Sequence, residues 1–119
     1  MRIFAYYNVQ KQTFSLKALE GPHKGRVIAH RKRVVLSDCE FAVSEAGRQR
    51  VLRERKKNVH AGVKGTWRQV LPEGLSCPVR LSYNPYKGKT FITVDTGTPV
   101  FNAKLVELRD HQAFVPKPD

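Results

Sequence analysis

The stretch VHAGVKGTWR, residues 59–68, carries the clearest structural signal in this chain. Its small and apolar residues alternate with polar ones, so that one side holds Val59, Ala61, Val63 and Trp67 and the other holds His60, Lys64, Thr66 and Arg68. A period of two is typical of a β-strand with one buried face. The chain is therefore expected to be organised around a β-sheet.

Further strands are expected on both sides of this stretch. Upstream they are residues 3–9, 13–19, 26–30 and 34–43, and downstream they are 79–84, 90–95 and 100–109, the last with a bulge. Segments rich in Gly, Pro and Asn separate them, for example GPHKG at 21–25 and NPYKGK at 84–89. We expect a core of Phe4, Phe14, Leu16, Phe41, Leu52, Val63, Trp67, Leu81, Phe91 and Phe101.

One helix is predicted over residues 44–57. Ser44 is a suitable N-cap, Glu45 lies in the first turn, and the cations follow nearer the C-terminus, where the helix dipole favours them. The predicted fold class is α+β, mainly β: a small bent antiparallel sheet, or a partly open β-barrel, of seven to eight short strands with one helix. The 119 residues suit one basic domain, 1–115, with a frayed tail at 116–119.

The charge balance indicates a polyanionic partner. Lys and Arg number 22 and Asp and Glu number 10, which gives a formal charge of +12. No apolar run approaches the roughly 18 residues that a membrane span needs, so no membrane association is expected. Two cysteines exclude a disulfide scaffold and favour a reducing compartment, so a cytoplasmic location is expected.

The positive charge is concentrated in two stretches. One contains Arg31, Lys32 and Arg33, and the other is the predicted helix. On a helical projection Arg50, Arg53 and Lys57 form one stripe, whereas Arg48 and Arg55 lie between Val51 and Leu52. A third candidate contact is the hairpin tip that holds Tyr86, Lys87 and Lys89, where the tyrosine ring is placed to stack on a base. The candidate binding residues are Arg31, Lys32, Arg33, Arg48, Arg50, Arg53, Arg55, Lys57, Tyr86, Lys87 and Lys89.

Catalytic chemistry has little support in the sequence. The histidines and cysteines show no metal-ligand spacing, and no glycine-rich phosphate loop precedes a helix, so neither a metal nor a cofactor is expected. A small-molecule substrate is not expected either. The acids Asp38 and Glu40 beside Cys39 disfavour its thiolate. His60, on the polar side of its strand near Lys64, leaves open a small basic ribonuclease.

The segment GRQRVLRERKKNVHAGVKG, residues 47–65, resembles a block found in small proteins encoded by bacteriophages and prophages. YYNVQKQTFSL at 6–16 and YNPYKGKTF at 83–91 resemble the flanking blocks of such proteins. The resemblance implies a phage accessory protein that acts in the host cytoplasm, and it carries over no catalytic residue. The leading hypothesis is non-enzymatic nucleic-acid binding. The alternatives are a counter-defence inhibitor, like an anti-CRISPR protein, that binds a host nucleoprotein complex, and the small ribonuclease.

Overall fold

The computed structural model describes residues 1–8, 10–43, 49, 52–53, 61–71, 74, 76–83, 90–110 and 112–117. The elements with defined bounds are all strands. They are β1 (Arg2–Asn8), β2 (Thr13–Ala18), β3 (Val27–Arg31), β4 (Val34–Val43), β5 (Ala61–Arg68), β6 (Val79–Ser82), β7 (Phe91–Thr93), β8 (Pro99–Val100), β9 (Asn102–Arg109) and β10 (Gln112–Val115).

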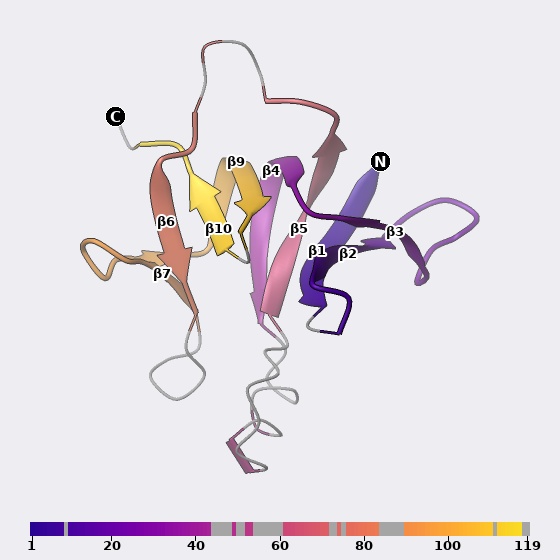
Figure 1. Cartoon of the computed structure of the whole chain (residues 1–119), viewed down its shortest axis with the longest axis horizontal. Helices are drawn as coiled ribbons and strands as arrows, with labels where there is room; N and C mark the ends of the chain where they lie inside the picture. Colours follow the sequence, from indigo (N-terminus) through magenta and orange to yellow (C-terminus); the bar gives the residue numbers. More distant parts are fainter. Residues whose placement is uncertain are drawn as a thin grey trace.

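The ten strands form one sheet in the order β3-β2-β1-β5-β4-β9-β10-β6-β7-β8. Every neighbouring pair is antiparallel. Strands β4 and β5 lie in the middle, β1 to β3 form one flank, and β6 and β7 lie on the other (Figure 1). The sheet is open, because β3 and β8 stand at its two ends.

The flank that ends in β3 bends back over the centre of the sheet. Three strands, β2, β1 and β5, lie between β3 and β4 in the sheet. If the sheet were flat, the distance from β3 to β4 would therefore be about 19 Å. However, β3 ends at Arg31 and β4 begins at Val34, so only two residues connect them. The three Cα–Cα steps from Arg31 to Val34 span at most about 11 Å, so the sheet cannot be flat here. The guanidinium carbon of Arg31 accordingly lies 5.5 Å from the ring centroid of Trp67 in β5. In Figure 1, β3 runs across the direction of β4 and β5.

The opposite flank bends in the same sense. The ring of Phe41 in β4 lies 5.0 Å, between centroids, from that of Phe91 in β7, although β9, β10 and β6 stand between these strands. One face of the sheet is therefore enclosed, and we call it the inner face. Its fully buried side chains include Ile3, Leu16, Leu36, Val63 and Val106, which belong to one core cluster.

The opposite, outer face is covered only in part. A second, smaller cluster there joins Val35, Cys77, Leu105 and Phe114, with Leu71 packed against it. Because the central strands are apolar on both faces at this point, Leu105, Val106, Glu107 and Leu108 are buried in succession. The rest of the outer face carries mainly polar and charged side chains, together with Phe4 and Tyr6 of β1.

The predicted fold class is wrong. The described residues form ten strands in one open sheet and no helix with defined bounds, whereas seven to eight strands in a bent sheet or partly open barrel with one helix are expected from the sequence. The segment expected as one strand, 100–109, is divided: Val100 pairs with β7, whereas Asn102 pairs with β4. Strand β10 was not expected from the sequence. The chain turns between β9 and β10 at Asp110, which has a φ of 49°, and no glycine in this segment indicates a turn.

The predicted helix over 44–57 lies mostly outside the described residues. Of its members only Gln49, Leu52 and Arg53 are described, and these three have helical backbone geometry. No helix with defined bounds stands among the described elements. The helical projection places Arg48 and Arg55 nearer the apolar side than Arg50, Arg53 and Lys57, so they are expected to be less exposed. Of these five only Arg53 is described, and it is exposed.

Most of the predicted core is confirmed, with two exceptions. The buried members are Phe14, Leu16, Val63 and Leu81, and Phe41, Trp67 and Phe91 pack against them half-buried; Leu52 is half-buried too. Phe4 does not belong to the core, because Ile3 and Ala5 occupy the inner side of β1. Phe101 is 62% exposed, since it lies between β8 and β9 where the chain passes from one strand to the other.

Candidate nucleic-acid interface

Four arginines from different parts of the chain gather on the outer face. The strand register places Arg68 of β5, Val35 of β4, Glu107 of β9, Phe114 of β10 and Arg80 of β6 in one row across five neighbouring strands. Two further arginines, Arg33 and Arg109, contact the glutamate of this row. We call Arg33, Arg68, Arg80 and Arg109 the outer arginine cluster.

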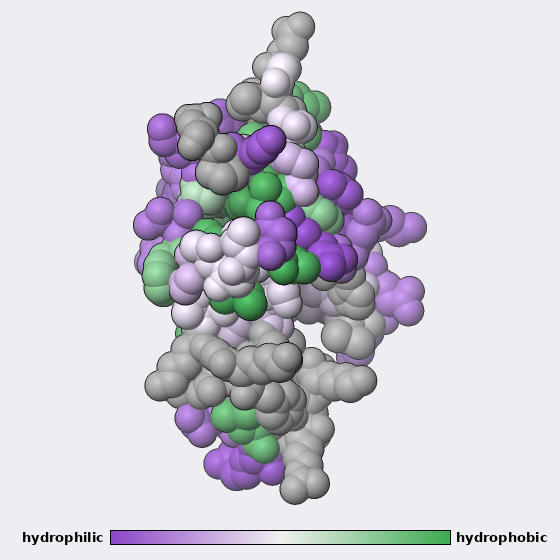
Figure 2. Space-filling view, turned by 90° about the vertical axis from the view of Figure 1, so that its left-hand side faces the viewer, coloured by the Kyte–Doolittle hydropathy of each residue, from purple (hydrophilic) through white to green (hydrophobic). Residues whose placement is uncertain are grey.

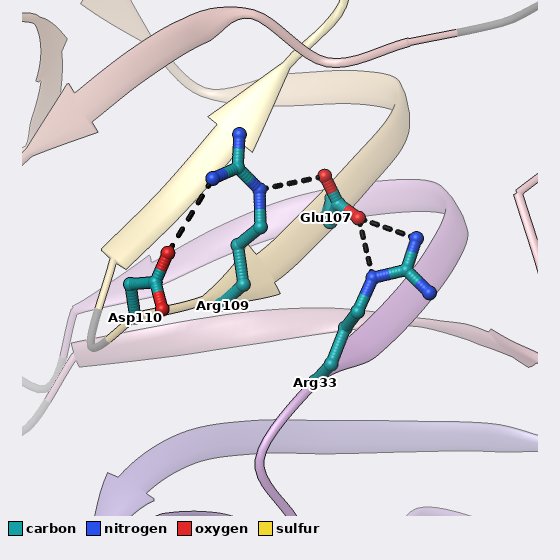
Figure 3. Close-up of polar contacts among 4 residues, drawn as sticks. All are labelled: Arg33, Glu107, Arg109 and Asp110. Atoms are coloured by element: carbon teal, nitrogen blue, oxygen red, sulfur yellow. Dashed lines mark hydrogen bonds and ion pairs between the residues drawn. The ribbon is translucent and has the colours of Figure 1, made fainter.

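Glu107 is held between Arg33 and Arg109 (Figure 3). The Nε of Arg33 donates to one carboxylate oxygen at 2.6 Å and its Nη2 lies 2.5 Å from the same oxygen, while the Nε of Arg109 donates to the other oxygen at 2.9 Å. The Glu107 side chain is only 7% exposed. Burial alone raises its pKa, but the hydrogen bonds from Arg109 and Arg33 and their charges outweigh burial and hold the pKa of Glu107 below its usual value.

Arg109 is also fixed by an aromatic ring. Its guanidinium carbon lies 3.8 Å from the ring centroid of Phe114, a cation–π contact, and its Nη1 lies 3.5 Å from a carboxylate oxygen of the exposed Asp110. The side chain remains 37% exposed. Arg109 therefore presents the outer edge of a positioned guanidinium to solvent.

The two ends of the row carry arginines without a carboxylate partner among the described residues. The Nε of Arg68 donates to the hydroxyl of Ser37 at 2.9 Å, and both Arg68 and Arg80 are exposed. Four arginines thus share one buried carboxylate in the row, and the local charge stays positive. Guanidinium groups in fixed positions suit the paired oxygens of phosphates.

The side of the molecule that carries β6 and β7 shows small hydrophobic patches separated by hydrophilic side chains (Figure 2). Ile92, Val94 and Phe101 are the large apolar residues near this end that are exposed, at 38%, 44% and 62%.

The run at residues 31–33 does not form one contiguous patch. Arg31 lies over Trp67 on the inner side, and its Nη1 donates to the carbonyl oxygen of His30 at 2.9 Å. Arg33 points to the outer face and pairs with Glu107, while Lys32 is exposed between them. Of the three, only Arg33 joins the outer arginine cluster.

The other predicted contact residues are mostly not described. Arg53 is exposed. Arg48, Arg50, Arg55, Lys57, Tyr86, Lys87 and Lys89 lie outside the described residues, as does His60, on which the ribonuclease hypothesis depends.

The sequence-based candidates omitted Arg68, Arg80 and Arg109. Each occupies a polar position of its strand, which is the only signal that the sequence provides. Their proximity follows from the register of strands that are not consecutive in the chain, and no local pattern encodes it. Within the described part of the chain, no group of three or more His, Cys, Asp or Glu side chains is arranged to hold a metal ion. The helical residues that the structure describes form no helix long and apolar enough to cross a membrane.

Comparisons with known proteins place the chain among phage proteins. The family described as "Mycobacterium phage L5 gene 82 protein" matches residues 1–116. The gene 82 protein of Mycobacterium phage L5 is 39% identical over 116 residues, which cover 92% of this chain and 91% of that protein. No solved structure matches. The resemblance to small phage-encoded proteins is thereby confirmed.

Proposed function

This chain belongs to the Mycobacterium phage L5 gene 82 protein family, and we propose that it is a phage accessory protein that binds nucleic acid without catalysing a reaction. The observation that supports this proposal best is the outer arginine cluster. Phosphate contacts supply most of the affinity in sequence-independent binding, and arginine side chains on a sheet surface provide such contacts.

The spacing of the cluster suits a nucleic-acid backbone. Arg68 and Arg80 stand at the two ends of a row that crosses five strands, about 19 Å at the usual strand separation. Arg33 and Arg109 lie between these ends, beside Glu107. One extended phosphate chain, or one edge of a duplex groove, can therefore contact several of these arginines together. The excess of cations over acids in the whole chain would strengthen the initial encounter.

The experiment is a salt-titrated binding assay with the full chain. Fluorescently labelled single-stranded DNA, duplex DNA and RNA of one sequence are titrated at increasing NaCl. Each phosphate that the protein neutralises contributes about −0.9 to the log–log slope on duplex DNA and about −0.7 on single strands. A steep slope is expected for the native protein, and the variant Arg68→Ala/Arg80→Ala should flatten it by about one unit or more.

A charge-matched control separates this surface from the general positive charge. Lys24→Ala/Arg26→Ala also removes two charges, but from the exposed connection between β2 and β3, on the flank away from β6 (Figure 1). This control should reduce affinity much less than Arg68→Ala/Arg80→Ala does. Equal effects of the two variants, or no salt-dependent binding of any of the three nucleic acids, would show that the proposal is wrong.

A further inference from the structure

Strand β1 turns two aromatic side chains to the outer face. Ile3 and Ala5 are buried on the inner side, so Phe4 and Tyr6 alternate with them and point outward. Their ring centroids are 5.8 Å apart and the ring planes meet at 29°, so the two rings stack on each other. Both are half-buried, which leaves part of this surface open to solvent.

The backbone of β5 lets the Phe4 ring lie close to the sheet. A Cβ atom built on Gly62 would come within 2.7 Å of two carbon atoms of that ring. The same Cβ atom would come within 2.4 Å of the backbone oxygen of Ala5, so the close approach of β1 and Phe4 to β5 requires glycine here. The Phe4 ring therefore lies directly against the backbone of β5, and we call the stacked rings of Phe4 and Tyr6 the platform.

Two lysines flank this platform. In the register of the sheet Phe4 stands opposite Lys17 of β2 on one side and opposite Lys64 of β5 on the other. Both lysines are exposed, and neither has an ion-pair partner among the described residues. Aromatic rings between cations on an open sheet are the arrangement that single-strand binding proteins use, with bases on the rings and phosphates on the cations.

A chain of hydrogen bonds orients a histidine beside the platform. The backbone N–H of Lys11 donates to Oδ1 of Asn8 at 3.1 Å, so the Nδ2 of Asn8 is the group that donates to the Ser15 hydroxyl at 3.3 Å. Ser15, which is fully buried and stands opposite Tyr6, lies with its Oγ 3.0 Å from Nδ1 of His30.

The contact with Ser15 holds the histidine ring by its Nδ1 atom. His30 is exposed, and its Nε2 atom, which this contact does not use, can form a hydrogen bond with a ligand. Ser15 is itself fully buried, so the pair positions His30 and does not provide a nucleophile.

We infer that the outer surface of β1 holds a stacking site for an unpaired base of single-stranded nucleic acid. The site consists of Phe4 against Gly62 and the adjacent Tyr6, with Lys17 and Lys64 for the adjoining phosphates and His30 as a hydrogen-bonding group. This inference rests on the proposed function and narrows its ligand. A duplex keeps its base faces stacked on one another, so it gains nothing from such a platform.

The test compares single-stranded and duplex DNA of the same sequence with the variant Phe4→Leu/Tyr6→Leu. Leucine keeps an apolar side chain over Gly62 but removes the aromatic faces. Stacking of one base is worth enough that single-strand affinity should fall about 5- to 100-fold. Duplex affinity and the salt slope should stay as in the native protein, because no arginine has changed. The matched control is Phe101→Leu, which removes an exposed aromatic ring elsewhere.

The outcomes distinguish this inference from the proposed function. If single-strand affinity falls no more than duplex affinity, or no more than in Phe101→Leu, the stacking site does not exist, while salt-dependent binding still supports the proposed function. If the native protein binds no nucleic acid, both proposals fail. A thermal melt of each variant shows whether it is folded, and a folded Tyr6→Leu single variant provides the same comparison should the double variant unfold.

Discussion

Glu107 and Arg33 are 74 positions apart in the sequence, yet the guanidinium of Arg33 places two nitrogens on one oxygen of the Glu107 carboxylate. Arg109 occupies the other oxygen. The contact joins the start of β4 to β9 at the centre of the outer face, where the carboxylate is nearly covered. The same residues thus serve the fold and set the charge of the proposed binding surface.

Acid should destabilise the protein through Glu107. Its pKa is below the usual value in the folded state, because the two arginines outweigh the effect of burial. The folded protein thus gains stability above the unfolded-state pKa of about 4.3, and it loses this gain as the pH falls through the lower folded-state pKa. Urea unfolding measured from pH 7 to pH 3 should show this loss in the native protein and a smaller one in Glu107→Gln.

Glu107→Gln should also lower the stability of the folded protein at neutral pH. Glu107→Gln keeps the shape but removes the charged partner of Arg33 and leaves Arg109 with only its long contact to Asp110, so the free energy of unfolding should fall by about 1 to 3 kcal/mol. Asp110→Asn is the control, since the Asp110 side chain is 79% exposed and its pair with Arg109 is long. It should change stability by less than about 0.5 kcal/mol. Equal effects at both positions would contradict a special role for Glu107.

Glu107→Gln should also strengthen nucleic-acid binding. The substitution removes the one negative charge in the row and frees Arg33 and Arg109 to contact phosphates. Affinity, measured on folded protein at moderate salt, should rise, and the log–log salt slope should steepen by up to about one unit for each arginine released. A lower affinity with a flatter slope would indicate that the carboxylate positions the arginines for binding.

Local alternation predicted where most strands lie, but not always which side they bury. In residues 3–7, IFAYY, both alternating sets are apolar, so the sequence does not reveal that Ile3 and Ala5 face inward. Of these five residues, the core expected from the sequence includes only Phe4. The structure instead places Phe4 on the outer face, where Gly62 makes room for its ring.

The outer arginine cluster could not be predicted, because it depends on pairing between distant strands. Arg68 and Arg80 are separated in the sheet by β4, β9 and β10. A bulge in β4 makes the register harder to predict from the sequence. Asp38, with a φ of 52°, shifts the pairing of β4 with β5 between Ser37 and Glu40. Composition did predict the excess of positive charge, but the location of that charge required the register.

Two apolar residues should respond very differently to truncation. Leu36 is fully buried in the inner core, so Leu36→Ala should reduce the free energy of unfolding by about 2 to 5 kcal/mol. Phe101, which its size assigns to the core, is 62% exposed, so Phe101→Ala should cost less than about 1 kcal/mol. Denaturant unfolding of both variants checks this. A large loss at Phe101 would place its ring in the core after all.

Both cysteines should resist modification while the protein is folded. Burial is the main cause that raises the pKa of Cys39 to about 12, and burial likewise raises the pKa of Cys77. The thiolate is the reactive form, so labelling with a thiol reagent at pH 8 should be slow in the native protein. In denaturant, where the pKa returns to about 8.5, both residues should react quickly.

Because Cys39 and Cys77 are free thiols in the structure, the intact mass should increase by two labels without a reducing agent. Rapid labelling of Cys39 under native conditions would show that β4 opens readily next to Gly65, whose Cβ position lies 3.0 Å from the Cys39 sulfur.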